Sequence, residues 1–359
     1  MKQAFNKNSR IYTPIKPAKS VWLRVALYVT LLLVLSAVCI FAYFVAEGKS
    51  VLFYQSPQST TQEGNVVDLV KITTFPHGVV PSQKKISEDP SLNEFVGAHL
   101  APTDGTLSMS SDVIQKIIGK LALLNVYQNL ASLSSRVLVI VPGERKEEVA
   151  SHFAKILGWN TQEEATFLSL IQDESPALDD GKFFPGTYSV NIGASPEEVA
   201  TLVVERFTTE VLSRYSADIE SVIPLSDTLI LASLIEREAR DFDDMRHISG
   251  VIWNRLFVDM RLQIDATLQY VKGTQSTKSW WPRVVPSDKY LASAYNTYKN
   301  KGLPPTPIAN PSLESIIAAL NPKQTDCLFY FHDKKGGFHC TKTYEEHVVL
   351  LKQYYGKGK

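Results

Sequence analysis

The sequence predicts an α+β protein with a single N-terminal transmembrane helix, a small α/β module and a mainly helical C-terminal region that ends in a β-hairpin. Three observations lead to this fold class. A charge-free run occupies residues 25–46, a strand–helix–helix–strand pattern begins at Arg136, and helical periodicity with capping residues recurs after residue 221. A chain of 359 residues has room for two or three folded domains.

The N-terminal part predicts a membrane anchor. Residues 1–24 contain six Lys or Arg and no acidic side chain, whereas residues 25–46 contain no charge. As a helix, the apolar run would extend roughly 33 Å, about the thickness of a bilayer core. The basic residues before it and Glu47 after it predict a cytoplasmic tail and a chain body on the outer side of the cell membrane. A cleaved signal peptide is the alternative, but the run is too long for one.

A polar linker at residues 47–65 follows the anchor, and we divide the rest into residues 66–135, 136–220 and 221–359. In residues 66–135 we expect an α/β subdomain with a strand at Val66–Phe75 and a helix at Ser111–Tyr127. Its role is open. The α/β module is expected to contain, in order, a strand at Arg136–Val141, helices near Lys146–Leu157 and Gln162–Gln172, a strand at Phe183–Val190, and a helix from Ser195 to about Tyr215.

The region 221–359 begins with a helix in which an acid occupies an apolar position. Ser226 and Asp227 are its N-cap candidates, and it extends to about Arg240. One apolar stripe is formed by Leu231, Leu234 and Ile235. Glu238 is the next position on that stripe, whereas Glu236 lies roughly 200° away around the helix. An acid withdrawn from water on one side has a raised pKa, which suits proton donation to a glycosidic oxygen. The alternative is a surface acid at a helix end.

The remaining expected elements are a helix opened by Asp243 or Asp244, a helix from Ser312 to Leu320 capped by Asn310, a hairpin over Cys327–Thr341 and a terminal helix near Tyr344–Tyr354. The hairpin would turn at Lys334–Gly337. Closing it about that turn places Cys340 opposite a residue near Phe331 rather than opposite Cys327. We therefore expect no disulfide between these two cysteines.

Composition excludes several classes of function. The 37 basic and 37 acidic side chains balance, so no electrostatic basis exists for a nucleic-acid partner. The three cysteines have none of the zinc or redox spacings. His332, His339 and His347 also lack metal-ligand spacing, and we expect them at the surface of the hairpin and of the last helix. We expect neither a metal ion nor a cofactor.

Seven short motifs follow one another in the C-terminal half of the chain. They are Ala232–Ala239, Val251–Leu256, Met260–Thr267, Tyr295–Tyr298, Gly302–Pro305, Ile308–Pro311 and Phe329–Phe331. In this order they resemble the endolytic murein transglycosylase family (MltG/YceG-like). The resemblance covers about residues 130–355, and residues 66–130 depart from the family's usual N-terminal module.

The resemblance implies a single-pass inner-membrane enzyme with a LysM-like module ahead of a lysozyme-like catalytic region. Such an enzyme would cleave the MurNAc–GlcNAc β-1,4 bond within peptidoglycan glycan strands and leave 1,6-anhydro-MurNAc ends. It would act without a cofactor and would terminate the elongation of nascent strands. Peptidoglycan synthases of the elongation or division machinery are the partners that the resemblance suggests.

A lytic transglycosylase needs one carboxyl group that first donates a proton to the leaving oxygen and then accepts the proton of the sugar's own 6-hydroxyl. The resemblance places this acid in the triplet 236–238. The apolar stripe favours Glu238, and Glu236 is the alternative. Candidate substrate-binding residues are Gln263, Asp265 and Asn296, through hydrogen bonds, and Tyr295 and Tyr298, through stacking on sugar rings. For each of these five, a structural role in pinning or packing loops is the alternative.

Two other functions are compatible with the same residues. A hydrolytic muramidase would use Glu238 as acid and Asp265 as base or stabiliser, and its products would carry reducing MurNAc ends. A membrane-anchored glycan-binding or division-scaffold protein would have no turnover. In that case Glu238→Gln would retain full biological activity.

Overall fold

The computed structural model describes residues 28, 74–100, 117, 119–124, 135–273 and 279–356. The membrane anchor and linker expected at residues 25–65 lie outside this part of the chain, apart from residue 28. The strand expected at Val66–Phe75 and the helix expected at Ser111–Tyr127 also lie largely outside it. Within the described residues, no helix combines the length and the apolar character needed to cross a bilayer.

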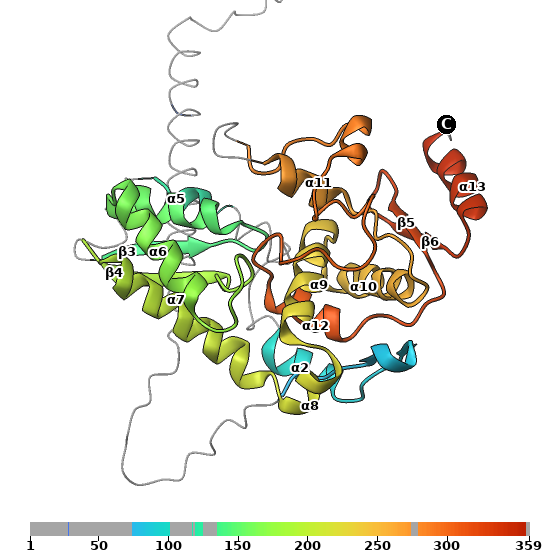
Figure 1. The fold of residues 1–359 in the computed structure, drawn as a ribbon, viewed down its shortest axis with the longest axis horizontal. Coiled ribbons are helices and arrows are strands. Elements are labelled where there is room, and N and C mark those ends of the chain that lie inside the picture. Colours follow the sequence, from blue (N-terminus) through green and yellow to red (C-terminus); the bar gives the residue numbers. More distant parts are fainter. Residues whose placement is uncertain are drawn as a thin grey trace, which may run out of the picture. The chain divides into compact units, whose positions relative to one another are not determined.

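A strand–helix–helix–strand unit is present where the sequence predicts it. Its elements are β3 (Ser135–Ile140), α5 (Lys146–Leu157), α6 (Thr161–Asp173) and β4 (Gly186–Asn191), followed by α7 (Pro196–Glu210). The strands β3 and β4 pair antiparallel with Leu138 opposite Tyr188. The helices α5, α6 and α7 gather around this pair (Figure 1), and their apolar faces share one core with it. We call residues 135–210 the α/β module.

Capping residues explain where the module's helices begin and end. α7 begins where the sequence predicts, because Ser195 caps it and Glu198 completes the capping box. The helix ends at Glu210 rather than near Tyr215, because the chain tightens there into a short 3₁₀ turn, η2 (Leu212–Arg214). Gly158 ends α5 in the left-handed conformation that glycine adopts without strain.

The helix α9 (Leu225–Glu238) is the centre of a second, larger core. It packs against α10 (Phe242–Phe257) and α12 (Leu313–Leu320) (Figure 1). The expectation of one apolar stripe is wrong, because every residue from Thr228 to Ile235 is buried and the helix is covered on all sides. The expected caps Ser226 and Asp227 lie inside the first turn. The N–H of Leu225 is bound by the side chain of Glu220 instead.

Two other helices also begin differently from the sequence expectation. Asp241 caps α10, and its carboxylate accepts the N–H of Asp244, so neither Asp243 nor Asp244 is the cap. Ser312 caps α12 in place of Asn310. Asn310 is buried, with its side chain engaged by other loops, and is therefore not free to cap a helix. When two possible capping residues are two positions apart, the sequence alone does not show which one caps the helix, because tertiary contacts can engage one of the two side chains.

The other elements lie around this larger core. They are β1 (Val79–Val80), η1 (Pro81–Gln83), β2 (Lys85–Ile86), α2 (Leu92–His99), α8 (Ala217–Val222), α11 (Asp265–Lys272), η3 (Pro286–Tyr290), β5 (Phe329–His332), β6 (Phe338–Thr341) and α13 (Tyr344–Tyr355). Residues 74–100 belong to this core as well, since Phe75, Val79 and Phe95 are buried in it. The N–H of Gly78 donates to the carbonyl of Leu320 at the end of α12.

The C-terminal hairpin forms as predicted, but its cysteines do not behave as predicted. β5 and β6 pair antiparallel with Tyr330 opposite Cys340. Cys327 and Cys340 form a disulfide, with 5.7 Å between their Cα atoms, so the expectation of no disulfide is wrong. The strand ladder begins at Phe329, and the chain before it turns, with Thr325 accepting the N–H of Cys327. Cys327 therefore lies outside the paired strands. The expectation of no disulfide assumed that Cys327 continues the strand pairing.

Candidate active site

Three elements meet at the carboxyl group of Glu238. Glu238 is the last residue of α9 and is half-buried. The hydroxyl of Tyr330, from β5, donates to its carboxylate over 3.0 Å. The backbone N–H of Ala266, in the first turn of α11, donates to the same group. An acid at a helix end is thus enclosed by a strand on one side and a helix N-terminus on the other.

This environment keeps a proton on Glu238 at higher pH than usual. Burial raises the pKa of Glu238 to about 6, and the nearby charge of Asp265 acts in the same direction. The hydrogen bonds from Tyr330 and Ala266 and the proximity of His332 oppose the rise. With a pKa of about 6, roughly a tenth of the carboxyl groups are protonated at pH 7. The side chain can therefore both donate and accept a proton near neutral pH.

Tyr330 and Arg255 contribute to the site, and neither is among the candidates from the sequence. Burial, followed by the charge of Glu238, raises the pKa of Tyr330 well above its usual value, so its hydroxyl keeps its proton. Arg255 of α10 is buried and donates to the carbonyls of Leu262 and Leu328. These carbonyls lie just before α11 and β5, so Arg255 holds both segments that contact Glu238. In the sequence, Arg255 occupies a position on the apolar stripe of α10. A charged residue at such a position is the feature that could have identified Arg255 as a candidate.

Asp265 and Tyr298, two of the expected substrate-binding residues, lie near Glu238. Asp265 is exposed at the start of α11, and its carboxylate accepts the hydroxyl of Tyr298 over 2.6 Å. Gln263 is exposed two residues before α11, with its backbone N–H bound to the Thr297 carbonyl. Its φ of 52° places it in the left-handed region, a conformation that costs a non-glycine residue about 1 kcal/mol or more. Such strain is common where a loop is shaped for a ligand.

Asn296 and Tyr295 have structural roles. Asn296 is 0% exposed; its amide nitrogen donates to two loop carbonyls and its amide oxygen accepts the N–H of Tyr298. The hydrogen-bonding groups of Asn296 therefore pin the loop, which is the alternative role given for this residue above. The hydroxyl of Tyr295 pairs with Thr306, and its ring packs 4.9 Å from that of Tyr270. Of the five expected binding residues, the structure brings Asp265 and Tyr298 to the acid and leaves Gln263 exposed nearby.

Glu236 faces a different part of the molecule. Its carboxylate accepts the N–H and the hydroxyl of Ser312, at 2.9 Å and 2.5 Å. These groups lie at the start of α12, where a helix N-terminus favours negative charge. Burial nevertheless raises the pKa of Glu236 above its usual value. The two glutamates therefore point to separate helices, α12 and α11, as their angular separation on α9 predicts.

The histidines differ from the sequence expectation in one case. The side chain of His332 is only 15% exposed and its ring nitrogen lies 2.8 Å from the carboxylate of Asp244, so its expected surface position is wrong. His339 is 2.9 Å from Asp333 at the hairpin turn. In the part of the chain that the structure describes, no three His, Cys, Asp or Glu side chains are grouped so that they could hold a metal ion.

The fold and these contacts define a helix-rich protein in which a glutamate with a raised pKa lies where a helix end, a helix start and a strand meet. The chain belongs to the YceG-like family, whose sequence profile matches residues 111–353. It is 36% identical over 176 residues to an endolytic murein transglycosylase of Bacillus subtilis, a match that covers 49% of this chain and 48% of that protein. To an endolytic murein transglycosylase of Streptococcus pneumoniae it is 30% identical over 169 residues, or 47% of this chain and 31% of that protein.

A solved structure is also similar. The crystal structure of a YceG-like protein from Listeria monocytogenes matches with a TM-score of 0.52 and 28% sequence identity. The match covers 60% of this chain and 75% of that one. The fold described above therefore occurs in another member of the family.

Proposed function

We propose that this protein is an endolytic lytic transglycosylase that cleaves the MurNAc-β-1,4-GlcNAc bond within peptidoglycan strands and leaves 1,6-anhydro-MurNAc ends. The relatives named above support the choice of substrate and reaction. The observation that carries the proposal is the half-buried carboxyl of Glu238, whose pKa is raised to about 6 and which contacts Tyr330 and the N-terminus of α11. Glu236 is not the acid in this proposal, because its carboxylate is engaged by Ser312.

The reaction requires Glu238 to act twice. In its protonated form it donates the proton to the glycosidic oxygen, and the bond between that oxygen and the anomeric carbon breaks. The ionised carboxylate then accepts the proton of the sugar's 6-hydroxyl, whose oxygen bonds to the anomeric carbon. The N–H of Ala266 and the hydroxyl of Tyr330 stabilise the ionised form between the two steps.

The neighbouring polar groups suit a positively charged transition state. The exposed carboxylate of Asp265 can stabilise charge that develops at the anomeric carbon, and the hydroxyl of Tyr298 fixes its direction. Gln263 has an exposed amide that can bind an N-acetyl or hydroxyl group of the glycan. Preorganised groups of this kind act without reorganising during the reaction.

Hydrolysis is the second candidate, and the exposed position of Asp265 beside Glu238 favours it, since a carboxylate there could activate a water molecule. The test incubates the full-length chain with purified glycan strands and analyses the products by mass spectrometry. We expect products with 1,6-anhydro-MurNAc ends. Reducing MurNAc ends would replace the proposal with hydrolysis. No cleavage at all would favour a glycan-binding or scaffold protein without turnover.

The cellular setting is part of the same proposal. The charge-free run at residues 25–46 supports a single membrane anchor with a cytoplasmic tail, and the strand–helix–helix–strand order of the α/β module supports a LysM-like assignment. An enzyme in this position would cut nascent strands beside peptidoglycan synthases and so terminate their elongation. Fractionation of cells, followed by protease treatment from the outer side, tests the orientation.

A further inference from the structure

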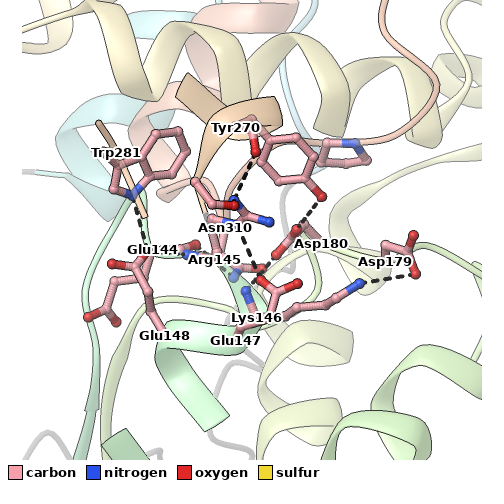
Figure 2. A network of polar contacts seen from close by, with 12 residues as sticks. Glu144, Arg145, Lys146, Glu147, Glu148, Asp179, Asp180, Tyr270, Trp281 and Asn310 are labelled. Atoms are coloured by element: carbon pink, nitrogen blue, oxygen red, sulfur yellow. Dashed lines mark hydrogen bonds and ion pairs between the residues drawn. The ribbon is translucent and has the colours of Figure 1, made fainter. Parts of the chain in front are cut away.

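The α/β module is fastened to the helical core by a buried polar junction (Figure 2). Asn310, which is 0% exposed, is central to it. Its backbone N–H and side-chain nitrogen both donate to the carbonyl of Glu144, at 2.9 Å each. Its side-chain oxygen accepts the N–H groups of Gly181 and Phe183, and its carbonyl accepts the N–H of Gly143. The two module segments that contain these residues are thus held against the core through their backbones.

Arg145, at the start of α5, reaches from the module to α11. It is 7% exposed, and one guanidinium nitrogen donates to the carbonyls of Tyr270 and Gly273, at 3.0 Å and 3.1 Å. These carbonyls belong to the last turn of α11 and the residue that follows it, where carbonyl groups lack helical partners. A positive charge at this end of a helix is also favourable. The guanidinium lies 4.1 Å from the centre of the Tyr270 ring.

Asp180, a second residue of the module, binds Tyr270 as well. The hydroxyl of Tyr270 donates to Asp180 over 3.1 Å, and the fully buried carboxylate of Asp180 also accepts the N–H of Lys146 over 2.6 Å (Figure 2). Tyr270 is therefore held at its carbonyl by Arg145 and at its hydroxyl by Asp180. Both contacts come from the module.

The carbonyl group of Gly273, which binds Arg145, belongs to a residue in a crowded position. A Cβ atom at Gly273 would lie 1.9 Å from the carbonyl oxygen of Trp280 and 3.1 Å from a guanidinium nitrogen of Arg145. No other residue type fits without moving one of these groups. The Trp280 carbonyl therefore requires a glycine at the end of α11, and Arg145 lies against the same residue.

The opposite end of α11 lies at Glu238. Asp265 begins the helix, and the N–H of Ala266 donates to the Glu238 carboxylate. The helix has 8 residues, about 12 Å in length, and a helix this short is not stable without tertiary contacts. Its position therefore depends on what holds its two ends. A shift at the Arg145 end moves the Ala266 N–H and Asp265 relative to the acid.

We propose that Arg145 is a positioning residue for the reaction at Glu238, which it serves by fixing the C-terminal end of α11 so that the N-terminal end stays against the acid. This inference rests on the function proposed above. It makes the α/β module part of the catalytic unit rather than only a separate binding unit. The module supplies the support for the helix that carries Ala266 and Asp265.

Other charged and titratable groups also face the two residues and are kept unchanged in the test. Around Glu238 they are Asp265 of α11, Arg255 of α10, Tyr330 and His332 of β5, Asp244 through its pair with His332, and Tyr298 through its bond to Asp265. Around Arg145 they are Glu147, Asp180 and Tyr270.

The experiment compares Arg145→Met with Arg206→Met in the full-length chain. Arg206 is a matched control, because it donates to the Thr187 carbonyl and lies 5.1 Å from the Tyr188 ring entirely within the module. For each variant, kcat and KM for release of anhydro products are measured across pH, together with the thermal unfolding midpoint. Wild type and Glu238→Gln are measured in parallel and report on the proposed function itself.

For Arg145→Met we expect kcat to fall about tenfold or more with a much smaller change in KM, since small misplacements at a reacting centre can cost up to about 100-fold. A shift of α11 in this variant weakens the hydrogen bond from the Ala266 N–H, which favours the ionised form of Glu238. The pKa of Glu238 then rises, and the alkaline limb of the pH–rate profile moves to higher pH by up to about one unit. Arg145→Lys retains the charge at the helix end and should recover part of the loss. Arg206→Met should change neither kcat nor the profile.

The inference is overturned if folded Arg145→Met has the kcat and pH profile of wild type. It is also overturned if Arg145→Met and Arg206→Met lose activity only in proportion to their loss of stability. If Arg145→Met does not fold, the test relies on folded Arg145→Lys. An unchanged kcat and pH profile in Arg145→Lys refute the inference. A lowered kcat with a shifted pH profile supports it. If wild type releases no anhydro products, the proposed function fails, and this inference fails with it.

Discussion

Glu238 and Glu236 are two residues apart on α9, and their carboxylates have different partners. In Glu238→Gln the side chain can no longer donate a proton, so we expect product release to fall by about 10³-fold, within the range for loss of a general acid. In Glu236→Gln we expect activity to stay near wild type, with stability lowered by about 1–2 kcal/mol because the bonds from Ser312 lose a charged acceptor. Product release and chemical denaturation are measured for both. The reverse ranking of the two variants would contradict the assignment of the acid.

Tyr330→Phe tests how the site sets the proton affinity of Glu238. The hydroxyl of Tyr330 donates to the carboxylate and so lowers the pKa of Glu238, which burial has raised to about 6. Without it the pKa of Glu238 rises further. Because the proposed acid must be protonated to start the reaction, we expect wild-type activity to fall as pH rises through about 6. In Tyr330→Phe we expect this fall to move to higher pH by about one unit or less. A pH–rate series on glycan strands measures the shift. A profile that moves to lower pH, or does not move, would contradict this role.

For single residues, the sequence predicts that Glu238 and Glu236 point in different directions but not what surrounds each of them. The angular spacing of residues around a helix is a local property, and it is enough to separate the two side chains. The role of Asn296 depends on loop carbonyls that only the folded chain brings to its amide. Tyr330 lies 92 residues from Glu238 in the sequence, and no spacing rule connects them.

Among the elements, α9 supplies Glu238, the acid proposed above, α11 supplies an N–H donor and β5 supplies a hydroxyl. The sequence predicts α9 and the hairpin that contains β5, because capping residues, periodicity and turn residues act locally, but it does not predict α11. It does not predict the disulfide at the end of the hairpin, which depends on a turn of the chain outside the strand ladder.

That disulfide joins the hairpin end across 13 residues, and Tyr330 pairs with Cys340 in the ladder. We expect the double change Cys327→Ser and Cys340→Ser to lower the free energy of unfolding by about 2–3 kcal/mol, as for other loops of this length. Denaturant unfolding, with and without reductant, measures the loss. The control is wild type in reductant, which should match the double variant. Equal stability of all samples would show that the bridge adds nothing to the fold.

At the scale of the whole molecule, the residues that the structure describes form two hydrophobic cores, which are connected by the polar junction of Figure 2. The sequence predicts the order of the elements in the α/β module and, of the larger core, α9, α10, α12 and the C-terminal hairpin. It does not predict the junction, since Arg145 and Gly273 are 128 residues apart and Glu144 and Asn310 are 166 residues apart. Buried arginine and asparagine side chains in loops carry no periodic signal. Their partners are backbone groups, which every residue possesses.

The junction predicts that the α/β module and the helical core unfold together. In Asn310→Ala, the Gly181 and Phe183 N–H groups lose a buried acceptor. Each unsatisfied group costs about 1–3 kcal/mol, and the loss falls on the contact between the two cores. We therefore expect one calorimetric transition in wild type and two in Asn310→Ala, the lower one from the less stable core. Asn300→Ala, which removes an exposed amide bonded only within its own loop, is the control and should keep one transition. Two transitions in wild type would mean that the cores fold independently, and the junction would then be too weak to hold α11 in place.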